Sequence, residues 1–340
     1  MRALKVLISS AIIASVAAVG SPSSAVVSWE FTQDSVSLGL TGVSPHAERV
    51  GSNDRLWYPG GLEGTAASDC NDAGVCARLT LTSRLGNDFT AVTLANGTRR
   101  AYFVDISPNA GTKTVSSAAC TTSECLGVGT STPIASDVAV SNDERAWGVP
   151  DAVVLPDGRV RVYLVVSPTK SNSCPEKVVS YISSDGVNFT RESGYRLEGG
   201  YVDTEVLRAK DGDWLMITSN GPGCGNGMQQ LFVTTSNDGL SWSAPQAVTK
   251  ADRRRLDPTG IEVSPNVFRI YYATSSSPMD QNYTLARGTL KLGSGTGSGQ
   301  VSIASPKAGR PCTKLGVKAK SGKIKLTCKK VKGKLVWSKK

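Results

Sequence analysis

One sequence pattern returns five times in the chain and restricts the fold more than any other feature. In each copy an Asp, or a residue in its place, opens an apolar strand, and a short turn then leads to a second strand rich in Tyr, Trp and β-branched residues. The copies open at Ser44, Asp88, Asp151, Asp203 and Asp257, so they begin 44 to 63 residues apart. A four-stranded propeller blade occupies roughly 40–50 residues, and the longer intervals leave room for loops.

The repeats predict an all-β fold, a five-bladed β-propeller over residues 26–292. Asn96-Gly97 and Asp157-Gly158 are hairpin signals, and no long amphipathic helix separates the copies. Radial packing of blades leaves few exposed sheet edges. A strand within residues 28–38 precedes the first copy, and we expect it to complete the blade that opens at Asp257 and so to close the ring.

A second motif comes late in the repeats. Residues 184–189 (Ser-Asp-Gly-Val-Asn-Phe) and 236–242 (Ser-Asn-Asp-Gly-Leu-Ser-Trp) are near copies, and residues 141–147 are a degenerate third. They resemble the Asp-box of sialidase-type propellers, in which Asp and Gly form a tight turn and the aromatic side chain packs between sheets. The resemblance implies a structural role for these turns, far from the active face.

The N-terminus has the layout of an export signal. Arg2 and Lys5 precede an apolar stretch of about 14 residues, and Ser23-Ser24-Ala25 fits a signal peptidase site. A membrane span needs roughly 20 apolar residues, and no later segment is long and apolar enough to supply one. We therefore expect residues 1–25 to be a cleaved signal peptide and the chain to be secreted or held at the cell surface.

The eight cysteines agree with export, because an even number of cysteines in an exported chain indicates disulfides. Neighbour pairing is the arrangement that we predict. The pairs are Cys70/Cys76, Cys120/Cys125, Cys174/Cys224 and Cys312/Cys328. The chain has no Cys-x-x-Cys and a single histidine, His46, so the sequence predicts no metal site and no cofactor.

The net charge of +10 is unevenly distributed along the chain. Residues 307–340 hold 13 of the 38 Lys and Arg and none of the 28 Asp and Glu, and two more basic residues lie in the first 25. This leaves 23 basic and 28 acidic residues in 26–306, a net charge of −5. We predict a flexible linker over 293–306, rich in Gly and Ser, and a small basic, disulfide-linked β-hairpin module over 307–340.

The basic module is expected to bind polyanions. Outside a cell these include anionic cell-wall polymers, and a solubilising tail without a specific partner is the alternative. We do not expect nucleic acid as a partner of an exported chain.

The residues that open the innermost strands converge at one end of a propeller channel. The repeats therefore predict a ring of carboxylates, in which Glu205 shares the strand face of Asp203. Glycoside hydrolysis needs one carboxyl group as an acid and a second as a base or nucleophile. The predicted catalytic residues are Asp88, Asp151, Asp203, Glu205 and Asp257. Capping of backbone N–H groups is the structural alternative for each of them.

These repeat openings resemble those of the five-bladed glycoside hydrolases: arabinanases, β-xylosidases and invertase-type enzymes. The likeness covers roughly residues 28–292, and Asp257-Pro258 matches the Asp-Pro at a blade start in that family. Two departures stand out. Ser44-Pro45 occupies the first blade, where the family usually has its catalytic base, and Asp203-Thr204-Glu205 stands in place of the usual Glu-Gly-Pro. The resemblance implies a glycan as substrate or ligand.

Three residues of the first copy, His46, Arg49 and Trp57, are the predicted substrate-binding residues, because His46 lies near the entry of that blade. A hydrogen-bonded structural role is the alternative for a lone histidine. Two further functions stay open. One is a non-catalytic surface propeller that binds glycan or protein, which the missing Asp of the first copy favours. The other is an exo-sialidase-like enzyme, which needs an arginine cluster for the carboxylate of its substrate.

Overall fold

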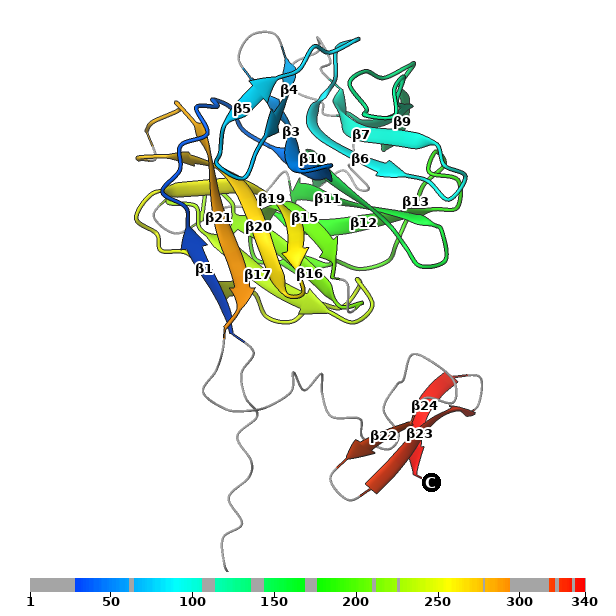
Figure 1. Cartoon of the computed structure of the whole chain (residues 1–340). Coiled ribbons are helices and arrows are strands. Elements are labelled where there is room, and N and C mark those ends of the chain that lie inside the picture. The colour runs from blue at the N-terminus through cyan, green and yellow to red at the C-terminus, as the bar shows by residue number, and fades with distance from the viewer. Residues whose placement is uncertain are drawn as a thin grey trace, which may run out of the picture. The chain divides into compact units, whose positions relative to one another are not determined.

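The computed structural model describes residues 28–60, 64–105, 114–135, 144–168, 176–209, 212–224, 227–277, 279–293, 318–321, 324–331 and 334–339. These residues form strands and turns but no helix, so none of them belongs to a helix that could span a membrane (Figure 1). Ser28–Gly293 forms one compact unit, and the strands after residue 317 belong to a second. The predicted signal peptide and nearly all of the predicted linker lie outside the described residues.

The first unit is a five-bladed β-propeller, as the sequence predicts. Blade 1 consists of β2 (His46–Val50), β3 (Asn53–Pro59), β4 (Thr65–Cys70) and β5 (Cys76–Arg78). Blade 2 consists of β6 (Asn87–Thr93), β7 (Arg99–Asp105), β8 (Thr114–Ala119) and β9 (Thr132–Ala135). Blade 3 consists of β10 (Glu144–Val154), β11 (Val160–Pro168), β12 (Lys177–Ser183) and β13 (Thr190–Arg191), with β14 (Leu197–Glu198) also paired to β12.

Blades 4 and 5 complete the ring. Blade 4 consists of β15 (Tyr201–Arg208), β16 (Trp214–Asn220), β17 (Leu231–Ser236) and β18 (Gln246–Ala247). Blade 5 consists of β19 (Arg254–Ser264), β20 (Val267–Ser275), β21 (Thr284–Leu292) and, from the other end of the propeller, β1 (Trp29–Gln33). In Figure 1 the blue β1 runs beside the orange β21, paired from Trp29↔Leu292 to Gln33↔Gly288. The predicted closing strand is thus confirmed.

The hydrophobic core lies between the blades. It divides into five clusters, and each joins two neighbouring blades, including blades 5 and 1. Successive side chains of a strand point to opposite faces of its sheet, and each blade is stacked between two others. The apolar residues of a strand therefore fill both faces of the blade. The ring is therefore closed by apolar packing at every junction between blades.

The innermost strands of four blades open with the same bulge. Two residues of blades 2 to 5 are unpaired there, just before Thr90, Asp151, Glu205 and Thr259. The first of the two has a left-handed backbone. These residues are Asp88, Val149, Asp203 and Asp257, with φ between 49° and 55°, and Ser44 of blade 1 has φ 42°.

This comparison corrects the predicted opening of the third copy. Val149, and not Asp151, is the counterpart of Asp88, so the third copy begins two residues earlier than its sequence indicates. Asp151 instead corresponds to Glu205, the third residue of the fourth copy.

The residue two positions after the left-handed residue of each blade pairs with a residue of the second strand. In four of the blades that second-strand residue has a large side chain that hydrogen-bonds to the next blade. Trp57 donates from its indole to Cys125 O (3.2 Å), Tyr102 donates to Gly186 O (2.9 Å), and Tyr163 donates to Gly239 O (2.7 Å). Tyr271 closes the series with a hydrogen bond to Asp54 Oδ2 of blade 1 (2.6 Å). In blade 4 the place is taken by apolar Ile217.

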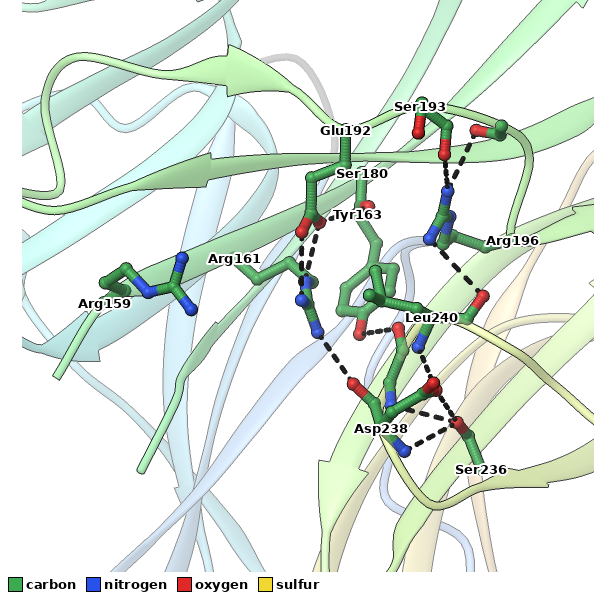
Figure 2. Close-up of polar contacts among 12 residues, drawn as sticks. Arg159, Arg161, Tyr163, Ser180, Glu192, Ser193, Arg196, Ser236, Asp238 and Leu240 are labelled. Atoms are coloured by element: carbon green, nitrogen blue, oxygen red, sulfur yellow. Dashed lines mark hydrogen bonds and ion pairs between the residues drawn. The ribbon is translucent and has the colours of Figure 1, made fainter. Parts of the chain in front are cut away.

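Two of these hydrogen bonds hold the Asp-Gly turns. In the turn of blade 4, Asp238 Oδ1 accepts from the amides of Leu240 and Ser241, both at 2.8 Å, and Ser236 Oγ accepts from the amide of Gly239 at 2.9 Å (Figure 2). Asp185 and Ser183 form the same contacts in blade 3. The likeness of these turns to Asp-boxes stays a prediction.

Glycine is required in both turns. A Cβ on Gly239, whose φ is +68°, would lie 2.8 Å from the hydroxyl of Tyr163. A Cβ on Gly186, at φ +74°, would lie 3.0 Å from the hydroxyl of Tyr102. Each turn therefore approaches the preceding blade more closely than a side chain allows.

A buried ion pair supports the junction of blades 3 and 4. Arg161 binds Glu192 with two hydrogen bonds, at 2.7 and 3.0 Å, and donates a third to Asp238 O across the junction (Figure 2). Arg196 reaches Leu240 O of blade 4 at 3.4 Å. Arginine suits this place because its planar group donates in several directions at once.

Two of the predicted disulfides are confirmed, Cys70–Cys76 and Cys120–Cys125. Cys224 and Cys328 are also disulfide-bonded, while their predicted partners lie outside the described residues.

The second unit contains a three-stranded antiparallel sheet. Its strands are β22 (Lys318–Ser321), β23 (Ile324–Val331) and β24 (Lys334–Lys339), with β23 in the middle. Leu326 and Cys328 of β23 are fully buried, whereas Lys325 and Lys329 of the same strand are exposed. Apolar residues and lysines alternate along this strand, so one face of the sheet is its core and the other face carries lysines.

Candidate functional site

Two rings of side chains surround a hollow at the start of the innermost strands. The mouth ring is defined by the left-handed residue of each blade: Ser44, Asp88, Val149, Asp203 and Asp257. The inner ring is defined by the residue two positions later in each blade: His46, Thr90, Asp151, Glu205 and Thr259. The whole inner ring is buried, whereas three members of the mouth ring are half-buried, so the mouth ring lies toward solvent.

The hollow between these rings is narrow. Its cavity is about 30 Å³, and a site for one water needs at least about 10–15 Å³. It thus has room for about two water-sized groups, whereas pockets for whole ligands are about 300–1,000 Å³. Among the residues that the structure describes, five of the side chains that line the hollow are acidic and none is Lys or Arg.

Inner-ring side chains bind the backbone of the next blade. Asp151 Oδ2 accepts from Val206 N at 2.7 Å, and Glu205 Oε1 accepts from Gly260 N at 3.2 Å. Thr259 Oγ1 accepts from Ala47 N at 3.0 Å and so links blade 5 to blade 1. Ala91 N of blade 2 likewise donates to His46 Nε2 of blade 1 at 3.4 Å. The inner ring therefore ties four of the five junctions through backbone amides, and Thr90 Oγ1 ties the fifth by donating to Asp151 Oδ1 at 3.4 Å.

Two inner-ring carboxyls form a pair. The side chains of Asp151 and Glu205 lie within hydrogen-bonding reach of each other. Burial, followed by the negative charge of Asp151, raises the pKa of Glu205 well above its ordinary value. Burial also raises the pKa of Asp151 to about 7, against the opposing effects of the Val206 amide and His46. Each member of this pair therefore holds its proton to a higher pH than an isolated carboxyl would.

A second carboxyl pair lies in the mouth ring. Asp257 Oδ2 accepts from Ser44 N at 2.9 Å, and its side chain hydrogen-bonds to Asp203. Burial, then the charges of Asp203 and Asp88, raises the pKa of Asp257 well above its ordinary value. Burial also raises the pKa of Asp203, and the charge of Asp88 adds to that rise. The mouth pair thus retains a proton that an isolated aspartate would lose.

Asp88 differs from these paired carboxyls. It is half-buried, it lines the cavity, and its carboxylate has no hydrogen-bond partner among the described residues. Its charge acts on both members of the mouth pair. The mouth therefore combines one unpaired carboxylate with one proton-holding pair.

His46 connects the inner ring to a charged pair outside it. Its Nε2 lies 3.2 Å from Glu48 Oε1, and Arg99 of blade 2 forms an ion pair with Glu48. Burial raises the pKa of Glu48, but His46 and Arg99 together bring it below its ordinary value. The imidazole packs against Trp57 and Phe89, with ring centroids 5.6 and 6.0 Å away. Its orientation is thus fixed by neighbours on both blades.

The structure brings together the five predicted catalytic residues and His46, all of which line the hollow. Arg49 and Trp57 lie elsewhere. Trp57 is 1% exposed and packs between blades 1 and 2, and Arg49 forms an ion pair with buried Asp54 at 2.9 Å. Neither belongs to the lining of the hollow.

Sequence reasoning missed Thr90, Thr204 and Thr259 of the hollow region, and Glu48 behind it. Thr204 lies between the two rings and is 3% exposed, and its hydroxyl has no hydrogen-bond partner among the described residues. One signal was available, because the residue two positions after each repeat opening is polar in every copy once the third copy begins at Val149. No group of three His, Cys, Asp or Glu side chains in the described part of the chain is arranged to hold a metal ion.

A second cleft borders blade 1. It measures about 370 Å³ and is larger than the hollow. Its lining includes Tyr58 and Ser68, whose hydroxyls are 2.9 Å apart, exposed Thr41 and the side chain of Arg78. Its size falls within the range of small-molecule sites.

Solved structures share the fold of the propeller. A thermostable family-43 glycoside hydrolase superimposes with a TM-score of 0.58 at 14% identity, over 79% of this chain and 97% of that one. An endo-arabinase from Bacteroides thetaiotaomicron gives 0.56 at 11% identity, over 78% and 99%. An N-acetylgalactosamine deacetylase from F. plautii, in complex with blood group B trisaccharide, gives 0.54 at 13% identity, over 78% and 94%. The chain has their fold.

No family model matches the sequence, and no curated protein matches it. The similarity to solved structures is therefore one of architecture, and the chemistry of this chain has to be argued from its own residues.

Proposed function

We propose that the chain is an exported glycoside hydrolase-like propeller that acts on a glycan at the mouth ring. The observation that carries this proposal is the contrast within the mouth: Asp88 offers an unpaired carboxylate, while Asp203 and Asp257 share a proton. Glycosidic bond cleavage needs one carboxyl that donates a proton and a second that accepts one. The glycoside hydrolases that share the fold support the same class of substrate.

The geometry supports separate roles for the mouth pair and for Asp88. Carboxyls of glycoside hydrolases stand about 5–10 Å apart, whereas the two members of each pair here touch through a hydrogen bond. Acid and base therefore cannot both come from one pair. In the proposed reaction the mouth pair protonates the glycosidic oxygen as the bond to the anomeric carbon breaks. Water adds to that carbon and gives its proton to Asp88.

The size of the hollow restricts how the glycan binds. A cavity of about 30 Å³ admits a hydroxyl-sized group but no sugar ring. The ring of the sugar would thus lie across the mouth, above Asp88 and Asp257. The inner ring would then serve to hold the blades in place beneath it.

The test is release of sugar from a panel of neutral oligosaccharides, including arabinan, xylan and galactan fragments. We expect Asp88→Asn and Asp257→Asn each to lower the rate by about 100-fold or more, because general acid–base catalysis contributes that much. Asp157→Asn, on an exposed turn, is the matched control and should keep the full rate. Equal rates in Asp88→Asn and the control, or no release by the unmodified chain, would overturn the catalytic proposal.

Binding without cleavage is the second candidate, and the larger cleft of blade 1 favours it. At about 370 Å³ this cleft has room for a sugar unit, unlike the hollow. Thr41→Trp would fill the cleft without touching either ring. Loss of glycan binding in Thr41→Trp, with binding unchanged in Asp88→Asn, supports this candidate over hydrolysis. The exo-sialidase alternative is disfavoured, because the described lining of the hollow contains no arginine.

The proposal includes export through residues 1–25 and retention at the cell surface by an anionic cell-wall polymer bound to the basic C-terminal module. Thirteen basic residues without an acidic one support this retention.

A further inference from the structure

We infer that one face of the β22–β24 sheet is a docking surface for a linear, phosphate-bearing polyanion. This inference rests on the proposed retention by the basic module, and it is independent of the chemistry at the hollow. It assigns binding to a specific face of the sheet and to a specific chemistry, rather than to the net charge of the tail.

The pairing register separates the two faces. Residues that lie opposite each other in an antiparallel sheet share a face, and alternate residues of a strand lie on opposite faces. Leu326 and Cys328 of β23 are buried and define the core face. Lys325, Thr327 and Lys329 alternate with them and lie on the other face, which we call the lysine face.

Neighbouring strands add to the lysine face by register. Lys320 of β22 lies opposite Lys325, and Lys318 lies opposite Thr327. On β24, Ser338 lies opposite Thr327, and Lys334 lies opposite Val331. By register, the face includes five lysine positions, the hydroxyl residues Thr327 and Ser338, and the apolar residues Val331 and Val336.

Such an arrangement is unfavourable in the isolated sheet. Like charges gathered on one face of a small sheet destabilise the pairing of its strands, and register places five lysine positions on this face. Residues 307–340 contain no acidic residue that offsets the charge within this segment. A polyanion bound along the face would relieve the repulsion and gain from the release of its counterions.

The side chains indicate the kind of anion. The described strands of the sheet carry Lys but no Arg. Arginine is favoured where a planar acceptor is bound in a fixed fork, whereas lysine binds phosphate as a point charge on a flexible stem. Successive positions on one face of a strand are about 6.7 Å apart, so Lys325, Thr327 and Lys329 offer donors at regular steps. A linear polymer with many phosphates can meet these donors one after another.

The experiment compares two double variants of the full chain with equal charge. K325Q/K329Q removes two lysines from the lysine face, and K330Q/K339Q removes two exposed lysines from positions that share the core face. The probe is long-chain linear polyphosphate, and its affinity is measured as a function of NaCl concentration. We expect K325Q/K329Q to weaken binding by about 10-fold or more and to lower the salt slope by about 2. K330Q/K339Q should change the affinity and the salt slope much less.

Equal loss in the two variants would overturn the assigned face and leave only a net-charge effect. Absence of binding by the unmodified chain to polyphosphate, to anionic-lipid vesicles and to a carboxylate polymer alike would overturn the proposed retention itself. Tighter binding to vesicles of anionic lipid, or to a carboxylate polymer, than to polyphosphate would overturn the assigned chemistry of the partner. Unfolding curves of all three proteins show whether the sheet is intact in each.

Discussion

The inner ring and the mouth ring come from the same five repeats, two residues apart, yet their side chains have different roles. Inner-ring side chains bind amides of the neighbouring blade, and the chain of contacts runs from blade 5 back to blade 1 through Thr259 and Ala47. The mouth ring has fewer such contacts, and Asp88 has none among the described residues. Carboxylates that look equivalent in the sequence are thus divided between holding the ring and facing solvent.

This difference shows that the number of acidic residues at a propeller opening is a poor guide to catalysis. A carboxyl that accepts a backbone hydrogen bond from the next blade contributes to the fold, as Asp257 of the mouth ring does through Ser44 N. A carboxylate with an open side is available to a ligand. The two rings can be separated by experiments on stability, because the inner ring makes most of these contacts between blades and Asp88 makes none among the described residues.

Truncating the inner ring should produce the largest effect. Glu205→Ala leaves the amide of Gly260 and the hydroxyl of Thr259 without their buried partner, and we expect a loss of about 3 kcal/mol in the free energy of unfolding. Asp88→Asn should stay within about 0.5 kcal/mol of the unmodified chain, since no described partner is lost and asparagine also tolerates the left-handed backbone at this position. Urea denaturation measures both.

Equal losses in these two variants would remove the distinction between the rings. Should Glu205→Ala fail to fold, Thr259→Val provides a milder test, because it removes the acceptor of Ala47 N but keeps the volume. We expect it to lose about 1–2 kcal/mol.

The pH dependence of stability sharpens the comparison further. The paired carboxyls have raised pKa values in the folded chain, so the folded state binds more protons than the unfolded one. The stability that these carboxyls contribute is therefore fully present below about pH 4, where the carboxyls of the unfolded chain also bind protons. It is lost as the pH rises through about 7, the pKa of Asp151. We expect the unmodified chain to lose on the order of 2–4 kcal/mol between pH 4 and 8.

Glu205→Gln should flatten this decline, because the amide keeps the acceptor oxygen and removes the like charge beside Asp151. At pH 8 this variant should be more stable than the unmodified chain by about 1–2 kcal/mol. Asp88→Asn should flatten the decline less, since it only lowers the charge near the mouth pair. Urea midpoints from pH 4 to 8 test the order, and an unchanged slope in Glu205→Gln would contradict the raised pKa values of this pair.

The smallest effect is expected at Val149, the one mouth-ring residue that is branched at Cβ. A left-handed backbone (φ 50°) is unfavourable for valine and better tolerated by asparagine. Val149→Asn should therefore stabilise the chain by about 1 kcal/mol. Val154→Asn, later on the same strand, is the control and should not stabilise, since its backbone is extended. A loss in Val149→Asn would show that packing of the valine outweighs the backbone strain.

Much of the fold could be predicted from the sequence. The repeats indicated the number of blades, and the hairpin signals at Asn96-Gly97 and Asp157-Gly158 coincide with the turns between β6 and β7 and between β10 and β11. The closing role of the first strand followed from the incomplete fifth copy. These features are local, or they depend only on the order of strands, so a single sequence contains them.

The site was harder to predict, because its rings depend on contacts between blades. Asp151 resembles a repeat opening in the sequence, and only the bulge before it shows that Val149 has that place. The same limit applies to Trp57, whose aromatic side chain suggests a sugar platform but packs between blades 1 and 2. Whether a carboxyl accepts from a neighbouring amide or faces a ligand depends on a partner about fifty residues away in the chain.

The pairing of β1 with β21 has a consequence for how the molecule is made. Ribosomes release β1 among the first residues of the propeller and β21 among the last, so β1 waits for its partner through the synthesis of four blades. Contacts between residues so distant in the chain form slowly. During that wait the edge of β1 and one face of blade 1 lack their final neighbours, and unpaired edges of this kind are prone to aggregation. The yield of folded protein is therefore set by the last strand to appear.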